Sequence, residues 1–575
     1  MSYKDIYDEW LNSDFIDEKS KDELLNIKDE KEIEDRFYKN LGFGTAGLRG
    51  KMACGTNRMN VYTVGRTTQG FANYLKSEFA NPDIAIAYDS RNMSKEFADV
   101  CAKVLSANDI KVYLYESLRP TPILSFAVRE LKLCGGIVIT ASHNPKEYNG
   151  YKIYGSDGSQ INQDLADKIL NCINSIRDFS EVKEISLKEA EEKGKLKYIG
   201  EDLDNIYYEK VKELVINEEL VSKHAQDLKV IYTPIHGSGN IPVRAMLEKL
   251  GYKNVEVVKE QEKPDGNFST VSYPNPENPD VFDLAVNMAS NKETDIIIGT
   301  DPDCDRIGVL AKNKNNEFEI LSGNQIGVLL TDYILKSRKE NNIITSKDTI
   351  VKTIVTSVLT DEVAKSYGAK IVNVLTGFKY IGEKIEEFNK LKSNNFVLGF
   401  EESYGYLCGD FVRDKDAVIA SVLILEMALF YKTHGRTLLD ALHDLYKSYG
   451  YYKESQFSIT MDGKEGLEKI ENIISTLRNN MPIFVGDAKI VEIHDYELSK
   501  KIDRNSKSIE VIELPKSNVI KIVLEDGSWF VVRPSGTEPK IKIYTSVICV
   551  TKEKVENKSQ LFIKNIKELL TKCTN

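Results

Sequence analysis

Residues 134–154 bring a hydroxyl, an imidazole and an ammonium group close together in the sequence. The β-branched residues 137–139 follow two glycines and predict a short buried strand. The strand runs into residues 140–145 (TASHNP), small and polar residues that predict a tight loop. In open α/β sheets the loops after strands carry the chemistry, so Ser142 is a candidate nucleophile, with His143 beside it and Lys152 ten residues on. The same residues also fit an ordinary turn whose Ser and Asn side chains bond their own backbone.

A second loop, residues 300–306 (TDPDCDR), carries three carboxylates at alternate positions, Asp301, Asp303 and Asp305. Three like charges in a tight turn repel one another and favour binding of a cation. Ligands that offer only oxygen favour a hard ion, and a site for phosphate chemistry favours magnesium. A calcium EF-hand is excluded because its sixth and twelfth positions would be Arg306 and Lys312. Arg306 indicates a phosphate beside the metal, although a solvated acidic turn is the plainer alternative.

Two further loops contain groups suited to a phosphorylated sugar. Residues 399–405 (GFEESYG) offer carboxylates and a hydroxyl to vicinal sugar hydroxyls, but acidic surface turns are also common. Residues 533–539 (RPSGTEP) combine an Arg fork, two hydroxyls and a glycine that opens backbone N–H groups, as a phosphate cradle would. A hairpin turn would explain the two prolines equally well.

Two glycine-rich loops add weaker signals. Residues 42–50 contain four glycines, which let the backbone approach a ligand closely, and Arg49 is their only charge. Residues 376–379 (TGFK) follow a predicted strand. We expect Arg49 to grip an anion, because a planar guanidinium on such a loop suits that task.

The elements that must position these loops repeat three times along the chain. Each repeat has three short apolar strands separated by amphipathic segments of helical length, and the third strand runs into one of the loops at 142, 301 and 401. Near residue 450 the pattern changes to alternating strands and a closing helix, which predicts an α+β module. We therefore expect three similar α/β domains with mixed sheets and one C-terminal α+β domain. Their predicted bounds are 1–220, 221–325, 326–450 and 451–575.

Composition narrows the class of protein. The 575 residues are 41% hydrophobic and 29% charged, as in ordinary globular proteins. The net charge of −11 argues against a nucleic-acid partner, which would favour a basic excess. The eight cysteines form no C-x-x-C pair, so we expect neither disulfides nor a zinc site. No apolar run predicts a signal peptide or a membrane span, so we expect a cytoplasmic location and no membrane partner.

Taken together, TASHNP, GTDPDCDR, GFEESYG and RPSGTEP closely resemble the α-D-phosphohexomutase superfamily, and GTAGLRG at 44–50 extends the match over nearly the whole chain. Within it the sequence is most similar to the phosphoglucomutase/phosphomannomutase branch that also includes phosphopentomutases. The resemblance implies a heart-shaped protein whose four domains surround a central cleft. The sequence departs from relatives at Phe400, Pro302 and Cys304, and the first of these leaves the preferred sugar open.

The resemblance also implies roles for individual residues. Ser142 would carry the phosphoryl group and, with Asp301, Asp303 and Asp305, bind Mg2+. Groups around the transferring phosphate would be Arg49, His143, Lys152 and Arg306, with Lys152 moving the proton. The sugar would meet Thr376, Gly377, Lys379, Glu401 and Ser403, and the second phosphate would meet Arg533, Ser535, Gly536 and Thr537.

We expect such a protein to interconvert glucose 1-phosphate and glucose 6-phosphate through a phosphoserine and glucose 1,6-bisphosphate, as a monomer or homodimer. Mannose or a pentose phosphate is the alternative substrate, and a sugar-phosphate sensor without turnover is the alternative function. A haloacid-dehalogenase-type phosphotransferase would use Asp301 as nucleophile but leaves Ser142 and Asp305 without a role. A Ser–His hydrolase is disfavoured because Ser142 lacks the G-x-S-x-G elbow.

Overall fold

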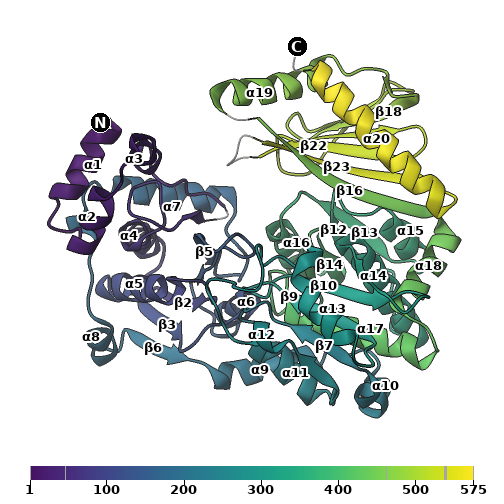
Figure 1. Cartoon of the computed structure of the whole chain (residues 1–575), viewed down its shortest axis with the longest axis horizontal. Helices are drawn as coiled ribbons and strands as arrows, with labels where there is room; N and C mark the ends of the chain where they lie inside the picture. Colours follow the sequence, from purple (N-terminus) through teal and green to yellow (C-terminus); the bar gives the residue numbers. More distant parts are fainter. Residues whose placement is uncertain (1, 46, 462, 536–539, 574–575) are drawn as a thin grey trace.

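The computed structural model describes residues 2–45, 47–461, 463–535 and 540–573. Its strands form four sheets, one after another along the chain, which confirms three α/β units with mixed sheets and a C-terminal unit with an antiparallel sheet. In Figure 1 the first unit lies on the left, the second and third lie below and to the right, and the C-terminal unit lies at the upper right.

Three short helices precede the first sheet. They are α1 (Tyr3–Asn12), α2 (Glu18–Leu25) and α3 (Glu30–Phe37). The side chains of Ser2, Asp17 and Asp29 each cap one helix by accepting a backbone N–H. The apolar faces meet around Trp10 and Phe37, whose rings lie edge to face at 5.6 Å.

The first α/β unit (residues 48–199) has the strand order β1-β5-β4-β2-β3-β6. Its strands are β1 (Leu48–Lys51), β2 (Asp83–Tyr88), β3 (Lys111–Tyr115), β4 (Gly135–Ile139), β5 (Tyr148–Gly155) and β6 (Leu196–Ile199). Its helices are α4 (Val61–Glu78), α5 (Ser94–Ala107), α6 (Thr121–Glu130), α7 (Gln163–Ser175), α8 (Leu187–Glu192) and the 3-10 turn η1 (Phe179–Glu181). In β2, Ile84 and Ile86 face α4 and α5, whereas Ala85 and Ala87 face α6. Because both faces are covered, the strand is apolar at nearly every position.

The second α/β unit (residues 201–321) has the strand order β11-β10-β9-β7-β8. Its strands are β7 (Val230–Thr233), β8 (Val255–Val257), β9 (Ile296–Thr300), β10 (Ile307–Lys312) and β11 (Phe318–Leu321). Its helices are α9 (Glu201–Lys212), α10 (Glu218–His224), α11 (Asn240–Lys249), α12 (Lys259–Glu262), α13 (Asp283–Ala289) and the 3-10 turns η2 (Ala225–Asp227) and η3 (Pro279–Phe282). The acidic loop joins β9 to the antiparallel β10.

The third α/β unit (residues 323–449) has the strand order β13-β12-β14-β15. Its strands are β12 (Asp348–Thr353), β13 (Lys370–Val374), β14 (Asn395–Phe400) and β15 (Tyr406–Leu407). Its helices are α14 (Gly323–Glu340), α15 (Leu359–Ser366), α16 (Phe378–Leu391), α17 (Ala417–Thr433) and α18 (Leu438–Tyr449). Among the described residues no single helix has the length and apolar character that a membrane crossing needs, and α17 with α18 meets that test only as a pair bent by 84°.

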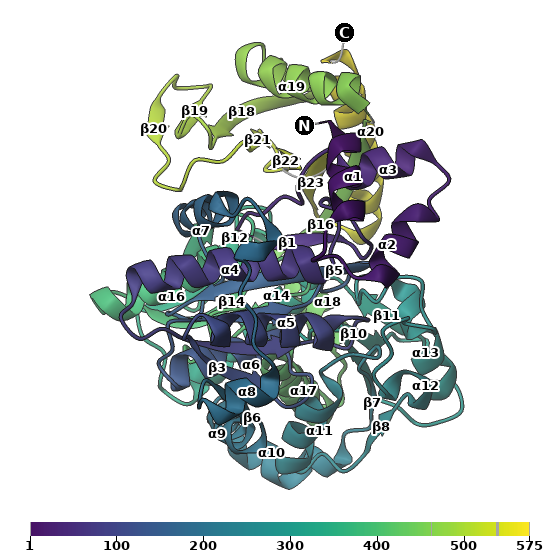
Figure 2. The ribbon, with the colours of Figure 1, turned by 90° about the vertical axis from the view of Figure 1, so that its left-hand side faces the viewer.

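The C-terminal unit (residues 451–572) is an antiparallel sheet in the order β16-β23-β22-β21-β18-β19-β20, with β17 beside β18. Its strands are β16 (Tyr451–Thr460), β17 (Phe484–Val485), β18 (Ala488–Asp495), β19 (Lys500–Asp503), β20 (Ile509–Val511), β21 (Ile520–Leu524), β22 (Trp529–Pro534) and β23 (Lys540–Cys549). Helices α19 (Gly463–Asn479) and α20 (Lys552–Lys572) accompany it. Figure 2 shows both helices at the top of the molecule, with β18–β20 extending to one side.

Two apolar contacts join the units. One core cluster runs continuously through the three α/β units, from Val138 in the first to Ile298 in the second and Leu398 in the third. A smaller cluster joins Ile354 and Val355, just after β12, to Trp529 and Val531 in the C-terminal sheet. The loops that end β4, β9 and β14 therefore sit on one continuous scaffold.

Candidate active site

The Ser142 loop is held rigidly although its backbone is unusual. Ser142 has φ 53°, in the left-handed region, and its side chain is buried. Thr140 Oγ1 accepts the Ser142 N–H at 2.8 Å. The guanidinium of Arg91 donates to the carbonyl oxygens of Ser142 and Asn144 at 2.6 and 2.5 Å. Sequence reasoning missed Arg91; the signal was a pair of charged residues, Asp89 and Arg91, directly after a buried strand.

The Ser142 hydroxyl touches groups from two loops. Its Oγ lies 3.1 Å from Asp301 Oδ2 and 3.1 Å from His143 Nδ1, and Arg306 Nη1 donates to it at 2.5 Å. Arg306 Nη1 also lies 2.8 Å from His143 Nδ1, which must accept because a guanidinium only donates. Burial, followed by the charges of Arg306 and Arg49, lowers the pKa of His143 well below its usual value. His143 is therefore neutral.

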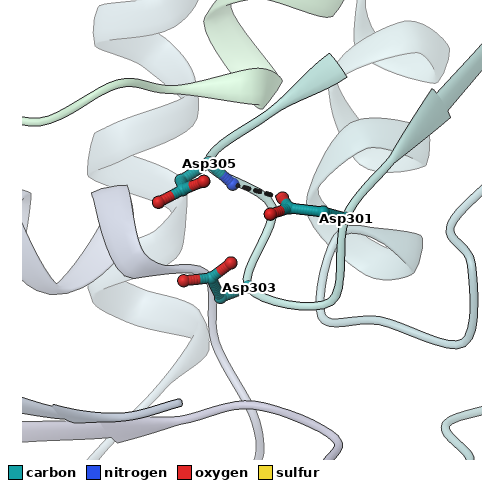
Figure 3. A group of neighbouring side chains, drawn as sticks. All are labelled: Asp301, Asp303 and Asp305. Atoms are coloured by element: carbon teal, nitrogen blue, oxygen red, sulfur yellow. Dashed lines mark hydrogen bonds between the residues drawn. The ribbon is translucent and has the colours of Figure 1, made fainter. Parts of the chain in front are cut away.

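The three aspartates of the acidic loop turn toward one another. One oxygen from each of Asp301, Asp303 and Asp305 lies within 4.8 Å of the others, and all three side chains are buried (Figure 3). The backbone N–H groups of Asp305 and Arg306 both donate to Asp301 Oδ1 at 3.0 Å, which fixes the turn. Burial, followed by repulsion from the other two carboxylates, raises the pKa of Asp301 well above its usual value.

The donor set fits a hard divalent cation. Oδ1 of Asp303 is buried and has no hydrogen-bond partner in the described part of the chain, which is costly for a carboxylate unless a cation meets it. All the candidate ligands are oxygen atoms, as Mg2+ prefers. Burial alone would raise the pKa of Asp303, but the ammonium of Lys152, with Lys415 and Arg306, lowers it below its usual value. Asp303 therefore stays ionised.

Two lysines flank the aspartates. Lys152 Nζ lies 2.9 Å from Asp303 Oδ2, and Lys415 Nζ lies 2.7 Å from Asp305 Oδ2. Lys415 was missed, although the charged run 413–416 (RDKD) before an apolar helix was visible. The residues on either side of Lys415 bond to the first and second units. Asp414 accepts a hydrogen bond from the Tyr154 hydroxyl at 2.6 Å, and Asp416 accepts one from the Tyr207 hydroxyl at 2.7 Å.

These groups face one cavity of about 610 Å3 to which all four units contribute. The predicted residues that line it are Arg49, Ser142, His143, Lys152, Asp305, Arg306, Thr376, Gly377, Glu401, Ser403 and Arg533. Asp301 and Asp303 belong to the adjoining acidic loop, and Lys379 and Ser535 are not among the lining residues. Gly536 and Thr537 lie outside the described residues.

The loop at 401–405 presents its polar groups to the cavity while its aromatic neighbour faces the core. Glu401 Oε1 accepts the N–H of Gly377 at 3.0 Å, which joins two of the predicted loops. Phe400 is fully buried, and a Cβ on Gly327 of α14 would lie 2.2 Å from its ring. Phe400, the residue at which we expect a departure from related sequences, therefore packs in the core. Glu402, which sequence reasoning missed, lines the cavity, and burial followed by the charge of Glu401 raises its pKa to about 7.

The cavity lining also contains groups from the second and C-terminal units. Lys542 and Tyr544 of β23 lie beside Arg533 of β22. Tyr273, Asn275, Glu277 and Asn278 enter from a loop that sequence reasoning missed, although three prolines within 274–279 marked a rigid segment. Burial raises the pKa of Glu277, and Arg306 and Lys542 partly oppose this. The cavity lining thus contains both cations, among them Arg49, Arg306 and Arg533, and carboxylates such as Glu277 and Glu401.

Comparison with known proteins agrees with this arrangement. Family models match consecutive segments: phosphoglucomutase/phosphomannomutase alpha/beta/alpha domain I at 40–179, domain II at 205–314, domain III at 322–449 and the C-terminal domain at 493–557. A phosphoglucomutase of Staphylococcus epidermidis is 38% identical over 542 residues, covering 94% of this chain and 96% of its own. One from Staphylococcus aureus is 37% identical over 550 residues, covering 95% and 97%.

A solved structure shares the fold. The open form of the Paramecium exocytosis-sensitive phosphoprotein parafusin, a phosphoglucomutase, superimposes with a TM-score of 0.67 at 19% identity, covering 93% of this chain and 95% of its own. Sequence and fold agree over nearly the whole length, and the chain belongs to the phosphoglucomutase/phosphomannomutase family.

Proposed function

We propose that the protein is a phosphoglucomutase that interconverts glucose 1-phosphate and glucose 6-phosphate. The names of its Staphylococcus relatives support the reaction. The observation that carries the proposal is the position of Ser142 Oγ, 3.1 Å from Asp301 and 2.5 Å from Arg306, in a cavity with Arg533 in its lining. A phosphoryl group on Ser142 would lie beside the guanidinium of Arg306, and a second phosphate could bind the guanidinium of Arg533.

Ser142 is the phosphoryl carrier. A free serine hydroxyl is a weak nucleophile, but a phosphoserine is a stored phosphoryl donor. The transfer spreads charge over oxygen atoms, so catalysis rests on positioning and electrostatic stabilisation. Arg306, Arg49 and neutral His143 surround the transferring group, and Lys152 moves the proton of the accepting or leaving sugar hydroxyl.

Mg2+, held by Asp301, Asp303, Asp305 and the serine oxygen, would neutralise negative charge on the transferring phosphoryl group. The unmatched Oδ1 of Asp303 supports this assignment. Glucose 1,6-bisphosphate is the proposed intermediate and activator: it must turn in the cavity so that either phosphate can face Ser142.

Recognition of the sugar and of the second phosphate is assigned to the remaining loops. Glu401 and Ser403 read sugar hydroxyls, and Thr376, Gly377 and Lys379 orient the ring. Arg533, with Ser535, Gly536 and Thr537, holds the phosphate that is not reacting. The four domains are proposed to span 1–220, 221–325, 326–450 and 451–575; helix α9, which contacts α6 of the first unit and α11 of the second, is counted here with the first domain. We propose a cytoplasmic monomer or homodimer that acts on small sugar phosphates and has neither a nucleic-acid nor a membrane partner.

The first experiment compares kcat/KM for glucose 1-phosphate, mannose 1-phosphate and ribose 1-phosphate, with Mg2+ and a trace of the matching bisphosphate. A strong preference for glucose is expected. A preference for mannose or ribose keeps the mechanism and changes the substrate, and tight binding of all three without turnover would favour a sugar-phosphate sensor.

A further inference from the structure

Thr121 lies at the start of helix α6 in the first α/β unit, yet it contacts the acidic loop of the second. Its backbone N–H donates to the carbonyl oxygen of Asp303 at 3.0 Å, and its Oγ1 donates to Asp303 Oδ2, also at 3.0 Å. The side chain is fully buried and is not among the residues that line the cavity. Thr121 therefore acts on Asp303 and has no contact of its own with a bound sugar.

The two oxygens of Asp303 have different surroundings because of this contact. Oδ2 accepts from Thr121 Oγ1 and from Lys152 Nζ, the latter at 2.9 Å. Oδ1 has no hydrogen-bond partner in the described part of the chain. Two donors on the same oxygen fix the rotation of the carboxylate plane about the Cβ–Cγ bond, so that the second oxygen points in one direction. In Asp303, Oδ2 is therefore hydrogen-bonded to the protein, and Oδ1 is available to coordinate a cation.

The segment that presents Thr121 is itself fixed. Pro120 and Pro122 restrict the backbone on both sides. The N–H of Arg119 donates to the carbonyl oxygen of Tyr88 at 3.0 Å, and its Nε donates to Asp204 Oδ2 at 2.9 Å. Thr121 is the first residue of α6. A threonine inside a helix often donates its hydroxyl to the carbonyl four residues earlier, but at the first position that carbonyl lies outside the helix. The hydroxyl of Thr121 donates to the acidic loop instead.

We propose that Thr121 is a positioning residue for the metal site: its hydroxyl orients Asp303 so that Oδ1 faces the cation, and it thereby sets the affinity for Mg2+. The inference rests on the proposed Mg2+ site. Groups that hydrogen-bond to metal ligands orient them, and their loss typically weakens metal binding or activity by about 10–100-fold. Thr121 also comes from the unit that carries Ser142, so it aligns the metal loop with the phosphoryl carrier.

The test uses the full-length protein, stripped of metal with EDTA, and measures the Mg2+ dissociation constant by calorimetry. Thr121→Val keeps the size, the β-branching and the backbone N–H while removing the hydroxyl. Thr121→Ser keeps the hydroxyl. Thr331→Val is the matched control, because Thr331 is equally buried but donates to the carbonyl of Gly327 within its own helix.

Thr121→Val should raise the Mg2+ dissociation constant by about 10–100-fold, while Thr121→Ser and Thr331→Val stay near wild type. In the same variant, excess Mg2+ should recover most of kcat, because the hydroxyl acts through the bound metal. A merely structural role would lower the unfolding temperature of Thr121→Val and leave its Mg2+ affinity unchanged.

The outcomes separate this inference from the proposed function. If the wild-type protein binds Mg2+ and Thr121→Val binds it equally well, the role of Thr121 is overturned and the metal site stands. If the wild type binds no Mg2+, the metal site itself is wrong. If Thr121→Val does not fold, Thr121→Cys replaces the hydroxyl by a weak donor of similar size, and an affinity equal to that of Thr121→Ser contradicts the proposal.

Discussion

The ammonium of Lys415 lies 2.7 Å from Oδ2 of Asp305, although Asp305 follows a strand of the second sheet and Lys415 precedes a helix of the third unit. Burial alone would lower the pKa of Lys415, but Asp305 and Asp414 raise it above its usual value, so the side chain stays charged. A fixed cation thus shares a carboxylate with the proposed metal.

Replacing Lys415 by methionine should separate metal binding from turnover. The variant removes a cation that competes for Asp305, so Mg2+ should bind more tightly by calorimetry. It also removes a positive charge from the cavity where phosphate charge develops, so kcat should fall by about 100-fold or more. Unchanged kcat with unchanged Mg2+ affinity would mean that the ion pair serves only the fold. Lys415→Met should raise the affinity for Mg2+, whereas Thr121→Val should lower it, so each variant serves as a control for the other.

Ser142→Ala should abolish turnover while glucose 1-phosphate still binds, because the hydroxyl is the only group removed from the cavity. Activity by a coupled assay and affinity by calorimetry check both parts. The wild-type protein, incubated with labelled glucose 1,6-bisphosphate, should retain label that survives cold acid and hydroxylamine. A label lost to hydroxylamine would instead indicate an acyl phosphate on Asp301, and an active alanine variant would exclude the phosphoserine mechanism.

Arg533→Ala should act mainly on KM. A hydrogen bond to a charged group contributes about 1.5–3 kcal/mol, which corresponds to about a 10–100-fold rise in KM at 1.4 kcal/mol per decade. Steady-state kinetics with glucose 1-phosphate measure the change. Arg436→Ala is the control, since Arg436 pairs with the half-exposed Asp444 away from the cavity lining. A KM equal to that of the control would contradict the role of Arg533.

Glu402 should make stability and substrate binding depend on pH near neutrality. Its pKa is raised to about 7 by burial and by Glu401, above the usual value of 4.5, so the folded protein binds its proton more tightly than the unfolded chain does. Stability is therefore lost as the pH rises from about 4.5 through about 7, the interval in which only the folded state holds the proton. Glu402→Gln should make the unfolding temperature depend less on pH over this range.

The same titration should appear in the kinetics. Above the pKa of Glu402 a second negative charge beside Glu401 opposes the substrate phosphate, so KM should rise with pH in the wild type and less in Glu402→Gln. Parallel pH profiles of KM for the two proteins would show that Glu402 does not sense the substrate. Glu401→Gln is a poor substitute here, because Glu401 accepts the N–H of Gly377 and supports the loop.

The fold was predictable from the sequence where the pattern of apolar residues in a segment matches the burial of that segment in the folded protein. Buried strands such as residues 84–88 and 296–300 are continuous apolar runs, and their loops follow at the expected ends. The antiparallel strands β1 and β5 were not predicted, because the glycines in or next to them, at 47, 50 and 150, obscure the alternation of apolar and polar residues. Gly47 and Gly150 let the two chain segments approach: a Cβ on Gly47 would lie 1.8 Å from the carbonyl oxygen of Tyr151, and a Cβ on Gly150 would lie 2.9 Å from that of Leu48.

The site was predictable only as far as its groups lie on recognisable loops. Arg91, Thr121 and Lys415 each work through a partner more than fifty positions away in the chain, and nothing in their immediate neighbours requires that partner. Glu277 is similar, since it is buried and one of the two cations near it, Lys542, comes from the C-terminal unit. Long-range pairing of charges is a property of the assembled units, which the spacing of residues in one segment does not encode.

The apolar cluster between the third α/β unit and the C-terminal sheet also provides an optical signal. The chain has two tryptophans, and both are buried. Trp10 lies among the N-terminal helices, whereas Trp529 lies in the cluster that joins the two units, with the Lys521 ammonium 4.3 Å from the centre of its ring. A rotation of the C-terminal unit against the third unit would change the packing and the electric field around Trp529, whereas Trp10 lies outside that cluster. Intrinsic fluorescence, with Trp10→Phe to remove the background, therefore reports on the junction between the third α/β unit and the C-terminal sheet without an added label.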